Sequence, residues 1–442
     1  MKQVFVTKKA LTTSLFLLLL SPDIYALRLT GVVTTNAEYS NNIDLKSTEK
    51  IEDLKQTASL NVGLREDRKN FQANANFNLR ADHYYKGTFS DETSLTTGFG
   101  LFNFDMIESF LTWKTSFSRT EVLTDSADKN TPDNRTHRNI LSTGPAILYK
   151  MSRTSNLDLS AKYINVKNSD EDTFDPEHVN GDIRYTYKIN RATRLSVNTN
   201  YESVIDGDGD EEYKQYQIGV SLWREVAYGM LQFDYGRTRL VPENENNIDT
   251  NVFDVSFIRK QFLLHDIKVR YKQNVRSSSI GFIAPSVSED GEIIIEDGEL
   301  GITYGSENFV IRRKQFSFSA NRYVSNYNYV VKGLWQQDES SSRVSSMGLN
   351  ERSRGGSVRV EKQLSPSLVA GFEYSFQLKN FASRPSIGKD KINTYRFDTS
   401  YNITSGFSID GYVGFDARSN VSDQSREYEE IATGFGLKWN LF

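Results

Sequence analysis

The sequence contains no cysteine, four histidines and eight prolines in 442 residues. The absence of cysteine excludes disulfide frameworks, cysteine-ligated zinc and cysteine nucleophiles. Neither sign of charge dominates, because 53 Lys and Arg residues stand against 57 Asp and Glu residues and give a net charge of −4. Without a large basic field, nucleic acid is not an expected partner.

Long hydrophobic runs are also missing, with one shorter exception near the N-terminus. Leu11 to Leu20 form a ten-residue apolar stretch that follows three lysines, and the small residue Ala26 stands before Leu27. This order of basic, apolar and small residues is typical of a secretory signal peptide, and the stretch is too short to span a bilayer. We therefore expect residues 1–26 to be a signal peptide and residues 27–442 to form a single exported domain; a buried core helix is the alternative for the apolar stretch.

The exported part alternates between apolar and polar residues. Within residues 71–80 the odd positions read Phe, Ala, Ala, Phe and Leu, and the even positions are polar: Gln72, Asn74, Asn76, Asn78 and Arg80. Residues 195–201, 231–235, 267–272 and 372–379 repeat the pattern. A two-residue period matches strands of a transmembrane barrel, although the strands of a soluble sandwich alternate too.

The connections between these segments alternate in length. Short turns are expected near residues 68, 106, 153, 191, 226, 326, 366 and 405, and between them lie long polar segments such as 121–138, 276–306 and 419–427. Outer-membrane barrels have short periplasmic turns and long extracellular loops. The sequence thus predicts an all-β, antiparallel, up-and-down transmembrane barrel of about 20 strands. Eighteen strands remain possible because residues 28–40 and 292–316 are ambiguous. Within 276–306 we expect a hairpin of 291–295 and 300–304 around a turn at 296–298.

Polar residues on the inward parity are the candidate lining of the lumen. They are Asn74, Asn76, Asn78, Arg80, Asn198, Asn200, Lys268, Arg270, Lys272, Arg313 and Arg396. Amides and mixed charges suit a wet interior that hydrogen-bonds hydroxyl-rich solutes, and a salt-bridged lining without transport is the alternative. The three cations of residues 268–272 share one face and would favour anionic solutes, unless they only form a solvated strand face.

The last residues form an amphipathic strand that ends in an aromatic residue. Trp439, Leu441 and Phe442 resemble the C-terminal signal read by barrel-assembly machinery, although Phe442 falls on the opposite parity from Trp439 and Leu441. We therefore expect three partners for the exported chain: this machinery, outer-membrane lipid and lipopolysaccharide.

Candidate metal and catalytic residues are few. Asp206, Asp208 and Asp210 have oxygen ligands at spacings that suit Ca²⁺, without a complete EF-hand loop; a solvated acidic loop is the alternative. Asp82 and His83 form the one pair that suggests an outer-membrane hydrolase, but adjacent strand residues point to opposite faces. No H-E-x-x-H or phosphate-binding glycine loop occurs. We expect neither an enzyme nor a cofactor.

Three segments carry a family resemblance: residues 35–44 (TNAEYSNNID), 144–149 (GPAILY) and 300–322, which begins LGITYGSENFVIRRKQ. With them the chain resembles the PEP-CTERM-system-associated outer-membrane proteins, β-barrels of exopolysaccharide and capsule loci. The resemblance implies a barrel in the outer membrane of a Gram-negative envelope, with polysaccharide or its export machinery as a partner. It implies a role in exopolysaccharide or capsule export or surface assembly; a general or sugar-selective porin is the alternative.

Overall fold

The structure is a computed structural model that describes residues 27–107, 110–123, 129–169, 175–205, 211–242, 247–262, 265–277, 286–287, 293–294, 310–340, 350–382 and 386–441. The expected signal peptide, the acidic residues Asp206, Asp208 and Asp210, and the terminal Phe442 lie outside these ranges. In the part of the chain that is described, no helix is long and apolar enough to cross a bilayer.

The described residues form mainly β-strands. The first eleven are β1 (Arg28–Ser40), β2 (Asp53–Arg68), β3 (Phe71–Tyr84), β4 (Glu92–Ile107), β5 (Leu111–Leu123), β6 (Arg135–Lys150), β7 (Ser155–Asn168), β8 (Glu177–Asn190), β9 (Thr193–Ile205), β10 (Glu211–Val226) and β11 (Gly229–Pro242). The next eleven are β12 (Ile248–Phe262), β13 (His265–Ser277), β14 (Ser286–Val287), β15 (Ile293–Ile294), β16 (Val310–Val324), β17 (Tyr327–Ser340), β18 (Asn350–Ser365), β19 (Leu368–Phe381), β20 (Lys389–Thr404), β21 (Phe407–Asn420) and β22 (Tyr428–Asn440). Two 3₁₀ helices are η2 (Pro132–Asn134) and η3 (Gln424–Arg426).

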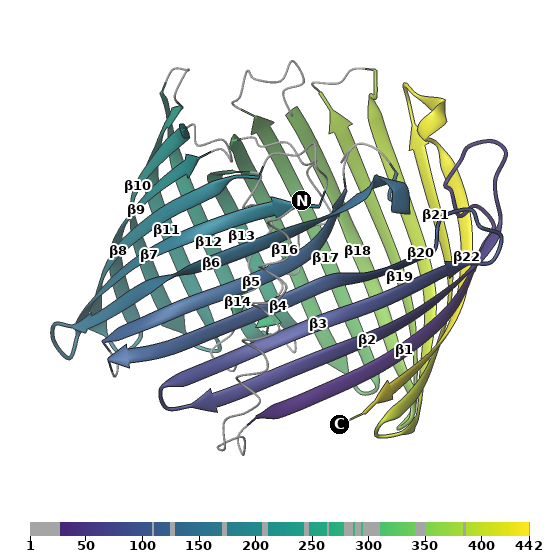
Figure 1. Ribbon diagram of the computed structural model, residues 1–442, viewed down its shortest axis with the longest axis horizontal. Helices are drawn as coiled ribbons and strands as arrows, with labels where there is room; N and C mark the ends of the chain where they lie inside the picture. Colours follow the sequence, from purple (N-terminus) through teal and green to yellow (C-terminus); the bar gives the residue numbers. More distant parts are fainter. Residues whose placement is uncertain are drawn as a thin grey trace, which may run out of the picture.

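Twenty of these strands form one closed antiparallel barrel (Figure 1). Each strand pairs with its neighbours along the chain, and β13 pairs directly with β16. The ring closes where residues 32–40 of β1 pair with residues 432–440 of β22, and the Leu441 amide extends this seam by donating to the Gly31 carbonyl at 2.7 Å. The predicted fold class is confirmed, with 20 strands rather than 18.

The two rims of the barrel differ in the length of their connections. At one rim, nine turns of two to four residues join the strands, for example 69–70, 191–192 and 405–406. At the other rim the connections run from five residues (206–210) to 32 residues (278–309). β1 begins and β22 ends at the short-turn rim, as the even strand number requires. The predicted asymmetry is therefore confirmed.

The longest connection contains a short hairpin whose partner strand differs from the predicted one. Ile293–Ile294 forms β15, as expected, but it pairs with the preceding Ser286–Val287 instead of with residues 300–304, which lie outside the described residues. The predicted turn at 296–298 lies outside the described residues, as does the connection 288–292 within this hairpin. Glycine and acidic residues occur at both places, so turn composition alone did not distinguish them.

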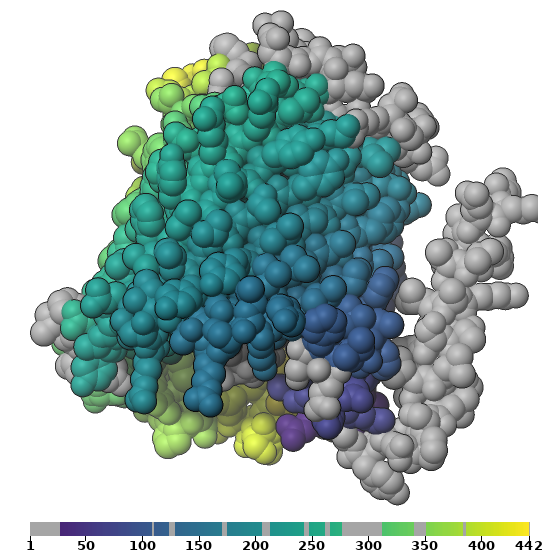
Figure 2. All heavy atoms as spheres, turned by 90° about the vertical axis from the view of Figure 1, so that its left-hand side faces the viewer, coloured from purple at the N-terminus to yellow at the C-terminus, as the bar shows by residue number. Residues whose placement is uncertain are grey.

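The outer wall of the barrel is apolar because one parity of each strand faces outward. On β8 and β9, Ile183 is 49% exposed and Val197 is 44% exposed, and across the barrel Phe372 and Phe397 reach 47% and 50%. Figure 2 shows side chains covering the outer wall around β8–β12. Soluble proteins rarely expose so large an apolar surface. A closed barrel with this belt is suited to a bilayer, where no strand edge can stay unpaired.

At the seam, two of the predicted assembly residues, Trp439 and Leu441, lie on this outer face. Trp439 pairs with Val33 across the seam and is 56% exposed, and Leu441 is 38% exposed.

Candidate functional site

The opposite parity gives the barrel a polar inner wall. On β2 and β3, Asn61 and Asn76 exchange two side-chain hydrogen bonds of 2.9 and 3.0 Å. Asn74 and Asn78 lie on the same face of β3, on either side of Asn76, and Asn78 accepts hydrogen bonds from Thr96. The three predicted asparagines therefore form an amide ladder along one strand.

Toward the loop rim, the asparagines of β3 are followed by charged residues. Arg80 Nε donates to Asp82 at 3.0 Å, and another of its nitrogens lies 3.5 Å from Glu121. Lys55 of β2 adds a second cation 3.4 Å from Asp82. Arg80 is therefore a paired charge at the upper end of this wall.

A second amide wall lies on β8 and β9. Asn200 donates to Asp182 at 2.7 Å, and Asn198 lies on the same face, beside Gly219 of β10. A Cβ at Gly219 would stand 3.1 Å from the Asn198 side-chain oxygen, so the glycine leaves room for the amide. Both predicted asparagines therefore belong to the inner wall.

The three predicted cations of β13 share the inward parity but are not equivalent. Arg270 makes two hydrogen bonds with Asp254 of β12, at 2.9 and 2.6 Å. Lys268 lies opposite Ser319 of β16, and Lys272 lies next to Asp254 in the register. Arg270 is therefore neutralised, which weakens the expected preference of this face for anions.

Arg313 of β16 is a buried charge and not part of an open surface. Its side chain is 2% exposed and donates to Asp338 of β17 at 2.8 and 3.3 Å, and Gln336 donates to the same carboxylate at 2.6 Å. Breaking a buried pair by removing one partner leaves an uncompensated charge. Arg313 thus has a structural role in the wall, different from the open lining predicted for it.

Arg359 of β18 joins three carboxylates into one network. It binds Glu361 at 2.8 Å, Glu373 of β19 at 3.1 Å and Asp398 of β20 at 3.0 Å. To reach Asp398 it crosses β19 at Gly371, where a Cβ would stand 2.8 Å from the carboxylate and 3.1 Å from the guanidinium. The glycine is therefore required for this contact between strands that are not adjacent.

Arg396 belongs to a second contact of this kind. Its guanidinium lies 4.2 Å from the ring centroid of Tyr412 on β21. The Tyr412 hydroxyl donates to Glu38 of β1 by crossing β22 at Gly434, where a Cβ would overlap the ring. Arg396, predicted as a lumen residue, therefore supports a bridge across the seam that closes the barrel.

Neither bridge was expected from the sequence. Period-2 alternation assigns a residue to a face, but not to a partner two strands away. A glycine at an inward position of the strand between two long polar side chains is the signal that would have indicated such a contact.

The loop rim holds a buried ionic cluster that was also missed. Asp390 of β20 is 1% exposed and is bound by Arg418 and Asn420 of β21 and, at 3.1 Å, by Arg426 of η3. The two arginines approach one carboxylate from a strand and from a loop. This cluster therefore ties the 421–427 connection to the end of the barrel.

A second group of polar contacts at the loop rim joins two connections. Glu52 accepts hydrogen bonds from Lys86 at 2.5 Å and from Tyr39 at 2.7 Å. The hydrogen bond from Lys86, followed by that from Tyr39, lowers the pKa of the Glu52 carboxyl below its ordinary value. Glu52 therefore stays ionised at neutral pH and holds the connections 41–52 and 85–91 together.

His83 forms an acid–base pair, but not with its neighbour in the sequence. Its Nδ1 lies 2.7 Å from Asp91, and this hydrogen bond lowers the pKa of the Asp91 carboxyl. Asp82 instead binds Thr57, as expected for adjacent residues on opposite faces. In the part of the chain described here, no hydroxyl hydrogen-bonds the other ring nitrogen of His83, so this pair lacks a nucleophile. The described residues also contain no cluster of three or more metal-ligating side chains.

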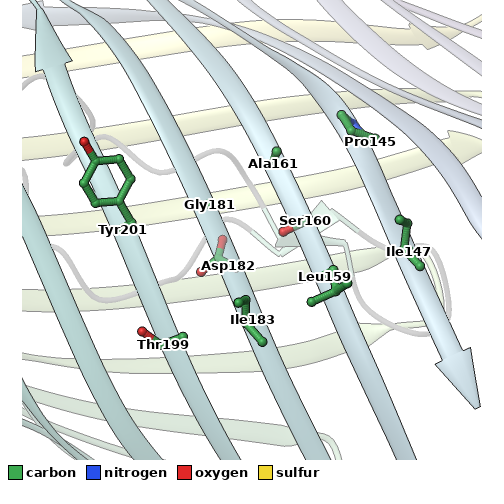
Figure 3. Close-up of a pocket in the computed structure, with 10 residues that line it drawn as sticks. All are labelled: Pro145, Ile147, Leu159, Ser160, Ala161, Gly181, Asp182, Ile183, Thr199 and Tyr201. Carbon is green, nitrogen blue, oxygen red and sulfur yellow. The ribbon is translucent and has the colours of Figure 1, made fainter. Parts of the chain in front are cut away.

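A depression of about 470 Å³ lies on the outer wall over β6–β9, away from the lumen. In Figure 3 the apolar side chains Leu159, Ile183 and Tyr201 surround Ala161 and Gly181, and Asp182 points the other way. The hollow forms because the two central residues have little or no side chain. This hollow faces lipid, so it is not a candidate site for a polar solute.

Comparisons with known proteins give structural similarity only. No family model and no curated protein matches the chain. Among solved structures, the FrpB iron transporter from Neisseria meningitidis (F5-1 variant) aligns at 9% identity over 95% of this chain and 83% of its own, with a TM-score of 0.48. OpdO of Pseudomonas aeruginosa aligns at 10% identity over 94% and 98%, with a TM-score of 0.38. The siderophore receptor PirA of the same species aligns at 9% identity over 93% and 80%, with a TM-score of 0.48. The fold assignment rests on the strand pairing.

Proposed function

We propose that this protein is a non-enzymatic diffusion channel of the outer membrane that passes hydrophilic solutes through its lumen. The observation that carries the proposal is the division of the wall into two faces. The outward parity is apolar, and the inward parity carries amides and ion pairs, including Asn61–Asn76, Arg270–Asp254 and the Arg359 network. An apolar belt around a polar interior is the arrangement of water-filled barrels.

The inner wall favours polyhydroxylated solutes within this class. Amide side chains both donate and accept hydrogen bonds, and carboxylates accept them, so the wall complements sugar hydroxyls. Export of an exopolysaccharide is the narrower version that the family resemblance implies, and it stays a prediction. Its test is deletion of the gene, after which an unchanged amount and location of surface polysaccharide would contradict it.

The direct test of the channel is conductance in a planar bilayer. The purified barrel should give discrete open states in potassium chloride, and neutral oligosaccharides should reduce the current as they occupy the lumen. A barrel that inserts stably, as shown by protease protection, and yet stays silent would refute the proposal.

A further inference from the structure

Two cationic side chains lie side by side at the short-turn rim. Lys188 of β8 and Arg194 of β9 lie directly opposite one another in the strand register, and both side chains are exposed. Like charges at directly opposite positions destabilise an antiparallel pair. Among the described residues, neither side chain has a carboxylate within ion-pair distance. The described residues therefore leave the positive charge of this pair without a neutralising carboxylate.

The pair faces the lumen. Two residues along the same ladder, Thr186 hydrogen-bonds Ser196, and two further on, Arg184 lies opposite Asn198 of the inner wall. The residues between them in sequence, such as Tyr187, belong to the apolar outer face. Solutes that enter or leave at the short-turn rim therefore pass these two cations.

An aromatic side chain fixes one of the cations in place. The Arg194 guanidinium lies 4.4 Å from the ring centroid of Trp223 on β10, and the Trp223 indole N–H donates to the sulfur of Met230 on β11. Stacking holds a guanidinium flat and leaves the N–H groups on its rim free to donate in the plane. Arg194 is thus held beside Trp223 with its N–H donors available.

This environment differs from that of three other arginines of the inner wall. Arg270, Arg313 and Arg359 each bind at least one carboxylate of the protein. Those arginines build the wall, because their charge is already satisfied. Arg194 is instead held by an aromatic face, which positions the guanidinium without neutralising it.

We propose that Arg194 and Lys188 form an oxyanion subsite at the short-turn rim, with Trp223 as a positioning residue. The subsite takes a carboxylate or phosphate group attached to a hydrophilic solute such as an acidic sugar. Arg194 binds two oxygens through its planar fork, and Lys188 adds a point charge. The inference rests on the proposed channel, because the solute must reach the lumen.

The test measures block of the channel current by three solutes with the same ring: glucose, glucuronate and glucose 6-phosphate. Glucuronate, glucose 6-phosphate or both should block the wild-type barrel more strongly than glucose, and the stronger of them identifies the preferred oxyanion. Arg194→Gln should raise the dissociation constant for this block about tenfold, the effect of losing a charge-assisted contact. Trp223→Leu should weaken the block without a change of charge, and Trp223→Phe should restore part of it.

The matched control is Lys114→Gln. Lys114 lies on the inner face of β5, near the same rim, and its replacement removes one positive charge as Arg194→Gln does. If Lys114→Gln and Arg194→Gln weaken block by the anionic sugars equally, the effect comes from the overall positive potential of the lumen, and the subsite is overturned. Block by glucose as strong as block by the anionic sugars would also overturn it.

Calorimetry on the solubilised barrel separates the two proposals. Binding of the anionic sugars without any conductance would refute the channel and retain the subsite. Conductance without binding or block by either anion would retain the channel and overturn the subsite.

Discussion

The bridge across the barrel seam gives the sharpest prediction, because it joins strands that are far apart in the chain. Tyr412 of β21 reaches past Gly434 and donates its hydroxyl to Glu38 of β1. Tyr412→Phe removes only this donor and keeps the ring, including its contact with Arg396. The seam itself has nine register pairs, whereas β1 and β2 share thirteen. The bridge therefore supplements the shorter of the two pairings of β1.

The expected loss follows from the charge and exposure of the partners. A hydrogen bond to a charged group contributes about 1.5–3 kcal/mol. Both side chains are only half-buried, so we expect the lower end, a loss of ~1.5 kcal/mol in the free energy of unfolding, or about a tenfold change in the equilibrium constant.

The assay is reversible urea unfolding of the barrel in lipid vesicles, applied to Tyr412→Phe, Glu38→Gln and the double variant. A bridge requires a coupling energy of ~1 kcal/mol or more between the two positions. Strictly additive losses would refute it, because each side chain would then act without the other.

Three further predictions concern the two faces and the loop rim. Val197→Lys places a charge on the lipid face and should cost about 2–4 kcal/mol if the site is near the bilayer midplane. Asn200→Lys places the same charge on the lumen face, opposite Asp182, and should cost much less in vesicle unfolding; equal losses would contradict the assignment of faces. Gly371→Val should separate the arginine from the carboxylate that it reaches across β19, and a changed cation-to-anion permeability ratio with an intact barrel would confirm this; an unchanged ratio would count against it. Because His83 lowers the pKa of Asp91, their contact should be fully present above the carboxyl's ordinary value of 3.8 and be lost as the pH falls through the lowered value. As the pH is lowered, residues 85–91 should lose amide-exchange protection only near or below pH 3.8. A loss that begins well above this pH would disagree with that sign.

Local alternation predicted the architecture because each strand of a barrel has one apolar and one polar face. Asn76 and Asn200 could be assigned to the inner wall from their own neighbours in the sequence. Partners could not be predicted in this way. Glu38 and Tyr412 lie 374 positions apart and meet only because the ring closes. Asp390 likewise gains Arg426 from a loop whose course depends on the finished barrel. Period-2 patterns contain no information about such distances.

The position of both terminal strands at the short-turn rim has a consequence for rearranged chains. Residues 28 and 440 lie on neighbouring strands of the closed ring, so a short linker between them would join β22 to β1 by one more turn of the kind already found at that rim. New ends could then be opened in any of the long connections, for example within 421–427. Such a circular permutant would keep every strand pairing and present both ends at the opposite rim. The rim at which the chain begins and ends is thus separable from the set of strand pairings that forms the barrel.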